Sequence, residues 1–254
     1  AGKIKISEYI DKLAKNDKRY LRKHDRTEKL PKDYEDDLFA EQTRARAYIK
    51  IQDGCNNFCS YCIIPYLRGR SRSRGIFSII NEVSSLDDSI KEIVLTGINV
   101  TDYKIDGKPA LLTLLTELDT FNKRLRLSSM EESLISEDFA KGLASLNNFC
   151  PHFHLSLQSG STQVLKRMNR HYTAEQFKKS VETIRKYFSH AGITTDVIVG
   201  FPGESEEEFQ ETVDFIKEVG FSALHIFIYS SREGTVASKL YKDLPYEVKK
   251  RRSE

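Results

Sequence analysis

The chain has 254 residues, of which 39% are hydrophobic and 30% charged, with a formal net charge of +3. This composition is typical of a globular protein and excludes a disordered or collagen-like chain. No apolar run approaches the roughly 18 residues that a membrane-spanning helix needs, so we expect no membrane partner. A net charge this small does not by itself indicate a nucleic-acid partner.

Residues 1–43 differ from the rest of the chain because they are dense in charge and poor in β-branched apolar side chains. The opening IKISEYIDKL favours one amphipathic helix, and the residues that follow through Pro31 are typical of an exposed connector. The pattern becomes regular from residue 44, so we expect one domain over 44–254. The chain begins at Ala1 without an initiator methionine, and we expect it to be a piece of a longer protein.

Short β-rich runs alternate with helical stretches from residue 44 onward. The predicted strands are AYIKIQ (47–52), EIVLTGI (92–98), RLRLSS (124–129), HFHLSLQ (152–158), TTDVIVGF (194–201) and ALHIFIYS (223–230). The predicted helices lie near 75–87, 109–119, 136–146, 173–188 and 204–219. Such alternation is typical of βαβ units with parallel strands and right-handed crossovers. Six units fit an incomplete barrel better than an eightfold one of about 250 residues, so the predicted fold is α/β, a partial (βα)6 TIM-like barrel.

Polar side chains fall on one face of several predicted strands, since successive residues of a strand point to opposite faces. These positions are His152, His154, Ser156 and Gln158 on the fourth strand, Arg126 and Ser128 on the third, Asp196 on the fifth and His225 on the sixth. The opposite, apolar faces need covering helices, so the polar faces should point into the barrel. This favours a cavity for a polar ligand, and an ordinary hydrogen-bonded interior is the alternative.

Three of the four cysteines, Cys55, Cys59 and Cys62, form the pattern C-x3-C-x2-C directly after the first strand. Loops at the carboxyl ends of parallel strands carry the chemistry in such folds. Structural zinc normally takes four ligands in two pairs, whereas a four-iron cluster on three cysteines leaves one iron open. Cys150 stands alone and is expected to be buried and structural. This usage indicates a metal site in a reducing compartment, and hence a cytoplasmic protein, and not a disulfide framework.

The cysteine motif, with Tyr61 before its third cysteine and its place after strand one, resembles the radical S-adenosylmethionine superfamily. Five blocks, CIIPYLRGRSRSR, EIVLTGIN, HFHLSLQSGSTQVLKRMNR, TDVIVGFPGESEEEF and FIYSSREGTVA, together resemble its methylthiotransferase family over about residues 44–240. LTGINV and RGRSRSR are most similar to the bacterial MtaB branch, which methylthiolates N6-threonylcarbamoyladenosine beside the tRNA anticodon. The MiaB branch, which acts on isopentenyl-adenosine in tRNA, and the RimO branch, which acts on a ribosomal protein, remain alternatives.

The resemblance implies a [4Fe–4S] cluster on Cys55, Cys59 and Cys62 that cleaves S-adenosylmethionine to a 5′-deoxyadenosyl radical, with tRNA as substrate and an electron donor such as flavodoxin. Family members also carry an N-terminal domain whose three cysteines bind a second [4Fe–4S] cluster, and a C-terminal TRAM domain that binds RNA. Neither pattern is present in this sequence. We therefore expect residues 1–43 to be a remnant of the N-terminal domain plus a charged linker, and 44–254 the catalytic domain.

The resemblance also suggests which residues bind the cofactor. Tyr61 is expected to stack on the adenine, with plain packing as the alternative. Gly97, Ile98 and Asn99 are expected to hold the methionine moiety, with a simple strand-ending turn as the alternative. The remaining candidates are Ser128, Glu131, Ser156 and Gln158 for the ribose and carboxylate, Arg170 for the methionine carboxylate or else a surface position, Ile198 and Phe201 at the adenine edge, and Tyr229 closing the adenine pocket.

An arginine run follows the cysteines, in which Arg68, Arg70, Arg72 and Arg74 alternate with Gly and Ser. It places positive charge where an RNA would enter, so we expect contacts to RNA phosphates that position the substrate without reading its sequence. The alternative is that these arginines brace the cysteine loop or pair with nearby carboxylates. A metal-stabilised RNA-binding module without catalysis is the alternative function for the whole chain.

Overall fold

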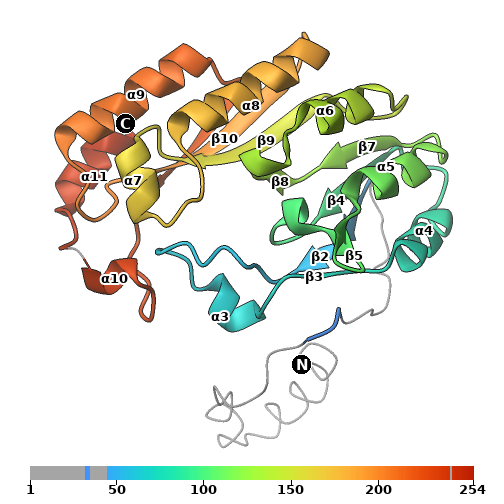
Figure 1. Ribbon diagram of the computed structural model, residues 1–254, viewed down its shortest axis with the longest axis horizontal. Coiled ribbons are helices and arrows are strands. Elements are labelled where there is room, and N and C mark those ends of the chain that lie inside the picture. The colour runs from blue at the N-terminus through green and yellow to red at the C-terminus, as the bar shows by residue number, and fades with distance from the viewer. Residues whose placement is uncertain (1–31, 35–44, 241) are drawn as a thin grey trace, which may run out of the picture.

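The structure, a computed structural model, describes residues 32–34, 45–240 and 242–254 (Figure 1). The amphipathic helix and connector expected within residues 1–43 therefore lie outside the described residues, apart from 32–34. Among the described helices, none combines the length and the apolar character needed to span a bilayer.

Strands and helices alternate as predicted, and the helices lie along the outside of a curved sheet (Figure 1). The strands of this sheet are β1 (Arg46–Lys50), β4 (Glu92–Thr96), β7 (Arg124–Leu127), β8 (Ser129–Met130), β9 (His152–Gln158), β10 (Gly192–Val199) and β11 (Ala223–Ile228). The intervening helices are α4 (Ile76–Ser84), α5 (Leu111–Asp119), α6 (Glu137–Ala144), α8 (Ala174–Tyr187) and α9 (Glu206–Val219). The shorter elements are β2 (Gln52–Asp53), α3 (Ile64–Arg68), β3 (Arg72–Ser73), β5 (Lys104–Ile105), β6 (Lys108–Pro109), α7 (Thr162–Arg167), α10 (Ala237–Leu240) and α11 (Tyr246–Ser253), with 3-10 turns at Val100–Asp102 and Glu132–Leu134.

The strands follow one another in chain order around an incomplete barrel. One group has the order β1-β4-β7 and the other β8-β9-β10-β11, and every pairing within the two groups is parallel. β7 and β8 are consecutive pieces of one strand, so the chain passes between the groups at Ser128. β1 and β11 each have a single strand neighbour in the part of the chain that the structure describes, which leaves the barrel open between them. The predicted partial barrel is confirmed.

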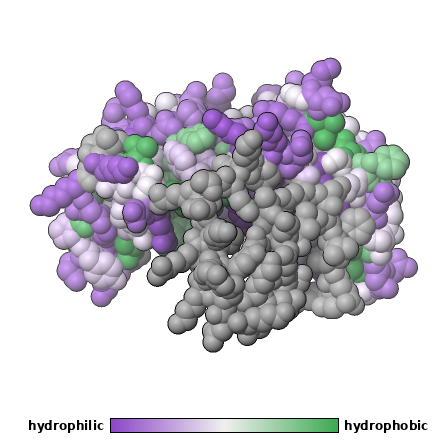
Figure 2. Space-filling view, turned by 90° about the horizontal axis from the view of Figure 1, so that it is seen from below, coloured by the Kyte–Doolittle hydropathy of each residue, from purple (hydrophilic) through white to green (hydrophobic). Residues whose placement is uncertain are grey.

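Burial alternates along β1, β7, β9 and β10, as the period-two pattern predicts, whereas β4 is buried almost throughout and β11 is mostly exposed. In β9, Phe153, Leu155 and Leu157 are fully buried, whereas His152, His154 and Ser156 are only partly buried. The apolar faces pack against the outer helices in one large core, and each fully buried leucine or phenylalanine contributes about 1.5–3 kcal/mol. Figure 2 views the molecular surface from below the view of Figure 1. On the described residues seen there, most of the surface is hydrophilic, and hydrophobic side chains form small separate patches.

Caps fix where the two longest helices begin. Thr173 and Gln176 form a capping box at the start of α8, and Ser205 and Glu208 form another at the start of α9. α9 ends at Gly220, whose φ of +64° is the left-handed conformation that glycine adopts readily. The predicted acidic first turn and glycine stop of this helix are confirmed.

Candidate functional site

The cysteine loop lies between β2 and α3 at the carboxyl end of the first barrel strand. β2 pairs antiparallel with β3, so both ends of the segment that carries the loop are held together. Gly54 precedes the first cysteine with a φ of +74°, and a Cβ there would lie 2.0 Å from the carbonyl oxygen of Arg70. The backbone amide of Cys55 donates to the carbonyl of Gly69, and that of Cys62 to Cys59. These contacts within the chain define the shape of the loop.

The loop is also tied to the far side of the barrel. The amide of Ser60 donates to the carbonyl of Met168 at 2.9 Å, and its hydroxyl donates to the carbonyl of Arg167 at 2.8 Å. The side-chain amide of Asn169 donates to the carbonyl of Phe58 at 3.0 Å. The segment after α7 thus holds the cysteine loop over the end of the barrel.

All three loop cysteines are free thiols and partly buried. Burial raises the pKa values of Cys55 and Cys62, and the neighbouring Cys59 raises them further. The buried thiolates of Cys55 and Cys62 are therefore costly on their own, and a bound metal centre would offset that cost with its positive charge. The donor set therefore fits a metal cluster.

Cys150 has different surroundings, as expected. It is buried at the start of β9, whereas the other three cysteines follow the carboxyl end of β1. Its sulfur accepts a hydrogen bond from the guanidinium of Arg124 at 2.8 Å. The prediction of a buried, structural Cys150 is confirmed.

A cavity of about 310 Å³ lies beside the cysteines and gathers residues from four strand ends. Its lining includes Cys55, Cys59, Cys62 and the predicted Tyr61, Gly97, Asn99, Glu131, Ser156, Gln158 and Arg170. It also includes Ile98 of the predicted segment, together with Asn57, Ile64, Ser129 and Met130, which the sequence did not single out. Residues more than a hundred positions apart in the chain thus meet at one place. A concave site with a few convergent polar groups is the usual form of a small-molecule site.

A buried ion pair forms one wall of the cavity. Arg170 lies 2.9 Å from Glu131, and the same carboxylate oxygen accepts a hydrogen bond from Asn57 at 2.7 Å. The guanidinium also donates to Cys59 Sγ at 3.4 Å and to the carbonyl of Ser156 at 3.3 Å. The alternative of a surface arginine is therefore wrong. Arg170 places a positive charge beside a cysteine sulfur and the strand-four carbonyl.

Two polar atoms around the cavity have no protein partner. Asn99 Oδ1 and Ser128 Oγ are buried and make no hydrogen bond within the described residues. Buried polar atoms are almost always paired, so such orphans are typical of a site that a ligand completes. The backbone of Asn99 is fixed, since its amide donates to Gln52 Oε1 at 2.8 Å.

Gln52 also explains why position 97, at the end of the second barrel strand, is a glycine. A Cβ on Gly97 would lie 2.9 Å from Gln52 Oε1, so no larger residue fits there without displacing Gln52. Gln52 is fully buried and also bonds the carbonyls of Asp53 and Gly54. Sequence reasoning missed Gln52, although a polar residue at the end of a buried strand was a usable signal.

Four residues predicted at the cofactor occupy other places. Ile198, Phe201 and Tyr229 belong with Tyr61 to a second apolar cluster, in which the Phe201 and Tyr229 rings meet edge to face with centroids 5.5 Å apart. Phe201 and Tyr229 are buried in this cluster and do not line the cavity. Both rings lie in the cluster against which Tyr61 packs. Ser128 lies at the break between β7 and β8, next to the lining and not in it.

The arginine run is divided between surface and interior. Arg72 and Arg74 have only 7% and 4% of their side chains exposed, and they pair with Asp53 and Glu82. Contrary to the expectation of RNA contact, these two brace the segment between β2 and α4. Arg68 is 42% exposed and lies 3.8 Å from Asp53, and Arg70 lies over the ring of Phe58 at 4.4 Å from its centroid. A repeating pattern of arginine and serine did not distinguish the two environments.

Comparison with known proteins gives a family and its relatives. Residues 49–216 match the family described as the Radical SAM superfamily. "Threonylcarbamoyladenosine tRNA methylthiotransferase MtaB" of Bacillus subtilis (strain 168) is 47% identical over 221 residues, covering 85% of this chain and 49% of the relative. "tRNA-2-methylthio-N(6)-dimethylallyladenosine synthase" of Clostridium novyi (strain NT) is 38% identical over 255 residues, covering 96% and 55%. The chain spans about half the length of the curated relatives it matches.

Solved structures share the fold at low sequence identity. The radical S-adenosylmethionine methyltransferase TsrM from Kitasatospora setae superposes with a TM-score of 0.63 at 20% identity, covering 76% of this chain and 38% of that one. Coproporphyrinogen III oxidase (HemN) from Escherichia coli gives 0.59 at 16% identity, covering 81% and 50%. These likenesses support the incomplete barrel described above.

Proposed function

Because this chain belongs to the radical S-adenosylmethionine superfamily, we propose that Cys55, Cys59 and Cys62 hold a [4Fe–4S] cluster and that the adjoining cavity binds S-adenosylmethionine. The observation that carries the proposal is the convergence on one cavity of the three cysteines and the predicted polar residues. The orphaned Asn99 and Ser128 oxygens support it. When bound, the cluster and S-adenosylmethionine supply the radical chemistry.

The chain's own residues bind and orient the cofactor in this proposal. Gly97 and Asn99, held by Gln52, present a fixed strand end to the methionine moiety. Tyr61, supported by the apolar cluster behind it, offers a ring face for the adenine. Ser156 and Gln158 at the end of β9 face the ribose. Arg170 forms an ion pair with Glu131 and a hydrogen bond to Cys59, so its main role is to position the cysteine loop. A contact from Arg170 to the methionine carboxylate would be secondary.

We infer methylthio transfer to N6-threonylcarbamoyladenosine in tRNA as the activity of the whole protein to which residues 44–254 contribute the catalytic domain. The relatives named for that reaction, at 46–47% identity, support the assignment. Beyond the three loop cysteines the chain contains only Cys150. A second [4Fe–4S] cluster would therefore be held by residues outside this chain. A cytoplasmic location and an electron donor such as flavodoxin complete the proposal.

Transfer to dimethylallyladenosine in tRNA is the second candidate, because relatives named for it match up to 96% of this chain. Nucleoside analysis of tRNA from a strain lacking the gene decides between the two. We expect the methylthio derivative of N6-threonylcarbamoyladenosine to disappear while its unmodified precursor accumulates. Loss of the methylthio derivative of dimethylallyladenosine instead would transfer the assignment to the second candidate, and no change in either would refute both.

A further inference from the structure

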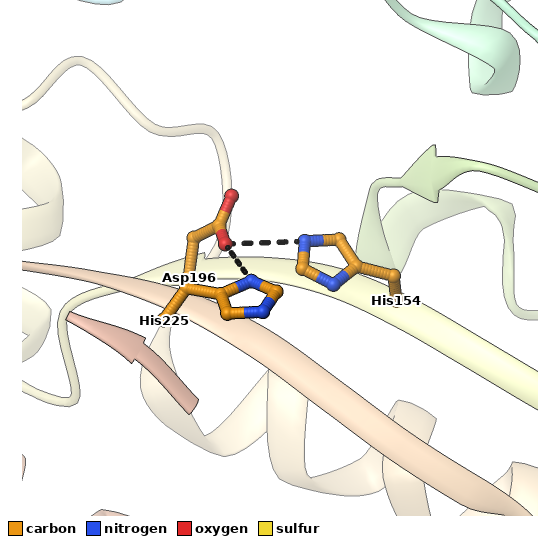
Figure 3. Close-up of side chains that lie close together, drawn as sticks. All are labelled: His154, Asp196 and His225. Carbon is orange, nitrogen blue, oxygen red and sulfur yellow. Dashed lines mark hydrogen bonds and ion pairs between the residues drawn. The ribbon is translucent and has the colours of Figure 1, made fainter. Parts of the chain in front are cut away.

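Two histidines and an aspartate meet inside the barrel, away from the cysteine loop. His154, Asp196 and His225 come from the neighbouring strands β9, β10 and β11, and their side chains point toward one another (Figure 3). Asp196 and His225 are direct partners in the register of β10 and β11. None of the three lines the cavity beside the cysteines. The proposed cluster and cofactor therefore leave this group unused.

The sheet is irregular where β9 passes Asp196. Thr195 pairs with Leu155, but Val197 pairs with Gln158, so two residues of β9 lie opposite Asp196 alone. Such a bulge bends its strand and re-aims nearby side chains, and bulges are common beside functional sites. Tyr172 holds the bulge, since its hydroxyl lies 2.7 Å from the carbonyl oxygens of both Ser156 and Leu157.

The spacing of the donor atoms fits a metal ion. His154 Nε2 lies 3.3 Å and His225 Nδ1 3.1 Å from the same oxygen of Asp196. Two ligands bound at about 2.0–2.1 Å to one tetrahedral ion are separated by roughly 3.3–3.4 Å. All the candidate ligand atoms lie within 4.8 Å of one another. His225, whose side chain is 61% exposed, lies at the solvent side of the set.

The imidazole of His154 is held by a hydrogen bond in the way that metal-binding histidines are. Its other ring nitrogen, Nδ1, is 2.9 Å from the hydroxyl of Thr194, which fixes the ring with Nε2 toward Asp196. Metal-binding histidines almost always use their second nitrogen in this way. The side-chain exposure rises from 12% at His154 through 27% at Asp196 to 61% at His225, so the set opens toward solvent on one side.

We propose that His154, Asp196 and His225 form a binding site for one divalent transition-metal ion of the zinc type. Two imidazoles and a carboxylate suit zinc, cobalt or iron, whereas magnesium and calcium prefer oxygen donors alone. Three protein ligands leave a fourth position open for water or for an anionic group of a bound molecule. This site is separate from the three-cysteine site and does not depend on its occupant.

Cobalt binding to the chain tests the site directly. In the C55A/C59A/C62A variant, which cannot bind metal through the loop thiols, we expect one Co²⁺ per chain, with visible bands of a four- or five-coordinate nitrogen and oxygen site. Asp196→Asn and His225→Ala should abolish these bands, and Thr194→Val should weaken binding roughly 10–100-fold. The matched control His190→Ala removes an exposed histidine outside the barrel and should change nothing.

Two results would overturn the proposal. One is a folded variant, judged by circular dichroism, that binds no cobalt; the other is cobalt binding that persists unchanged in Asp196→Asn and His225→Ala. The three side chains would then be a hydrogen-bonded network only. If the triple cysteine variant fails to fold, zinc content is compared between the cluster-containing chain and its Asp196→Asn variant after zinc dialysis. An excess of one zinc in the former supports the site, and equal contents refute it.

Discussion

The four cysteines of this chain have the same side chain but different surroundings, and the surroundings decide their chemistry. Cys55, Cys59 and Cys62 share one partly buried loop beside a cavity, so their sulfurs can meet at one centre. Cys150 is buried at the opposite end of the strands, against Arg124. Spacing in the sequence was sufficient to separate these two groups.

Single alanine substitutions should show this division. Cys55→Ala, Cys59→Ala and Cys62→Ala should each reduce the iron bound after anaerobic reconstitution from about four per chain to near zero, because each removes one of three ligands. Cys150→Ala should retain the iron. Iron and sulfide analysis measures both, and an equal loss in the Cys150 variant would contradict the three-ligand assignment.

Different arginines of the run are expected to contribute either to the stability of the fold or to RNA binding. Arg74→Leu leaves the buried Glu82 without its partner and should lower the free energy of unfolding by about 3–5 kcal/mol, measured by urea denaturation. Arg70→Gln, at an exposed position, should change it by about 0.5 kcal/mol or less.

For tRNA affinity we expect the exposed arginines of the run to matter. Arg68→Gln and Arg70→Gln together should weaken binding of cognate and non-cognate tRNA alike, because both arginines would neutralise phosphates of any sequence. The slope of log affinity against log salt should fall by about one for each arginine–phosphate pair that the substitutions remove. Filter binding at several salt concentrations measures this slope. An unchanged slope with normal iron content would remove the run from the RNA interface.

At the scale of elements, the main strands and helices were predictable, and their docking was not. Strand period, capping residues and the glycine stop located each barrel unit because these signals are local. The sequence did not predict α11, because its residues YEVKKRRS have no apolar periodicity. Its position is set by Lys249, which packs against Gly200, and by Arg252, which pairs with the buried Glu204 at 2.6 Å. The β9 bulge likewise depends on pairing between distant strands.

Neighbouring arginines of α11 offer a matched test of this docking. Arg252→Leu leaves Glu204 as a buried, unpaired carboxylate and should cost about 3–5 kcal/mol of unfolding free energy. Arg251→Leu removes a charge that pairs with Glu206 at the surface, and its effect should stay within about 1 kcal/mol. Equal effects of the two substitutions in thermal or urea unfolding would show that the buried pair does not anchor the helix.

At the scale of the whole molecule, residues from separate βα units become one site only through the curvature of the sheet. A recognisable sequence pattern marked each of three parts of the site: the cysteine loop, the end of the second strand at Gly97 and the end of the fourth strand at Gln158. Their shared cavity, and the place of Gln52 and Asn57 in it, required the barrel to be assembled. An aromatic residue at a strand end gives the same pattern whether it lines a pocket or packs behind one, so the sequence did not place Phe201 and Tyr229 in the apolar cluster with Tyr61.

Anaerobic reconstitution of the chain, followed by electron paramagnetic resonance with and without S-adenosylmethionine, tests whether the three cysteines hold a cluster that binds this cofactor. We expect about four iron and four sulfide per chain, and a reduced-cluster signal that changes when S-adenosylmethionine is added. The change should be absent when Gly97, packed against Gln52, is replaced by valine. One tetrahedral zinc at the three cysteines, or a four-iron cluster whose signal ignores S-adenosylmethionine, would contradict this expectation.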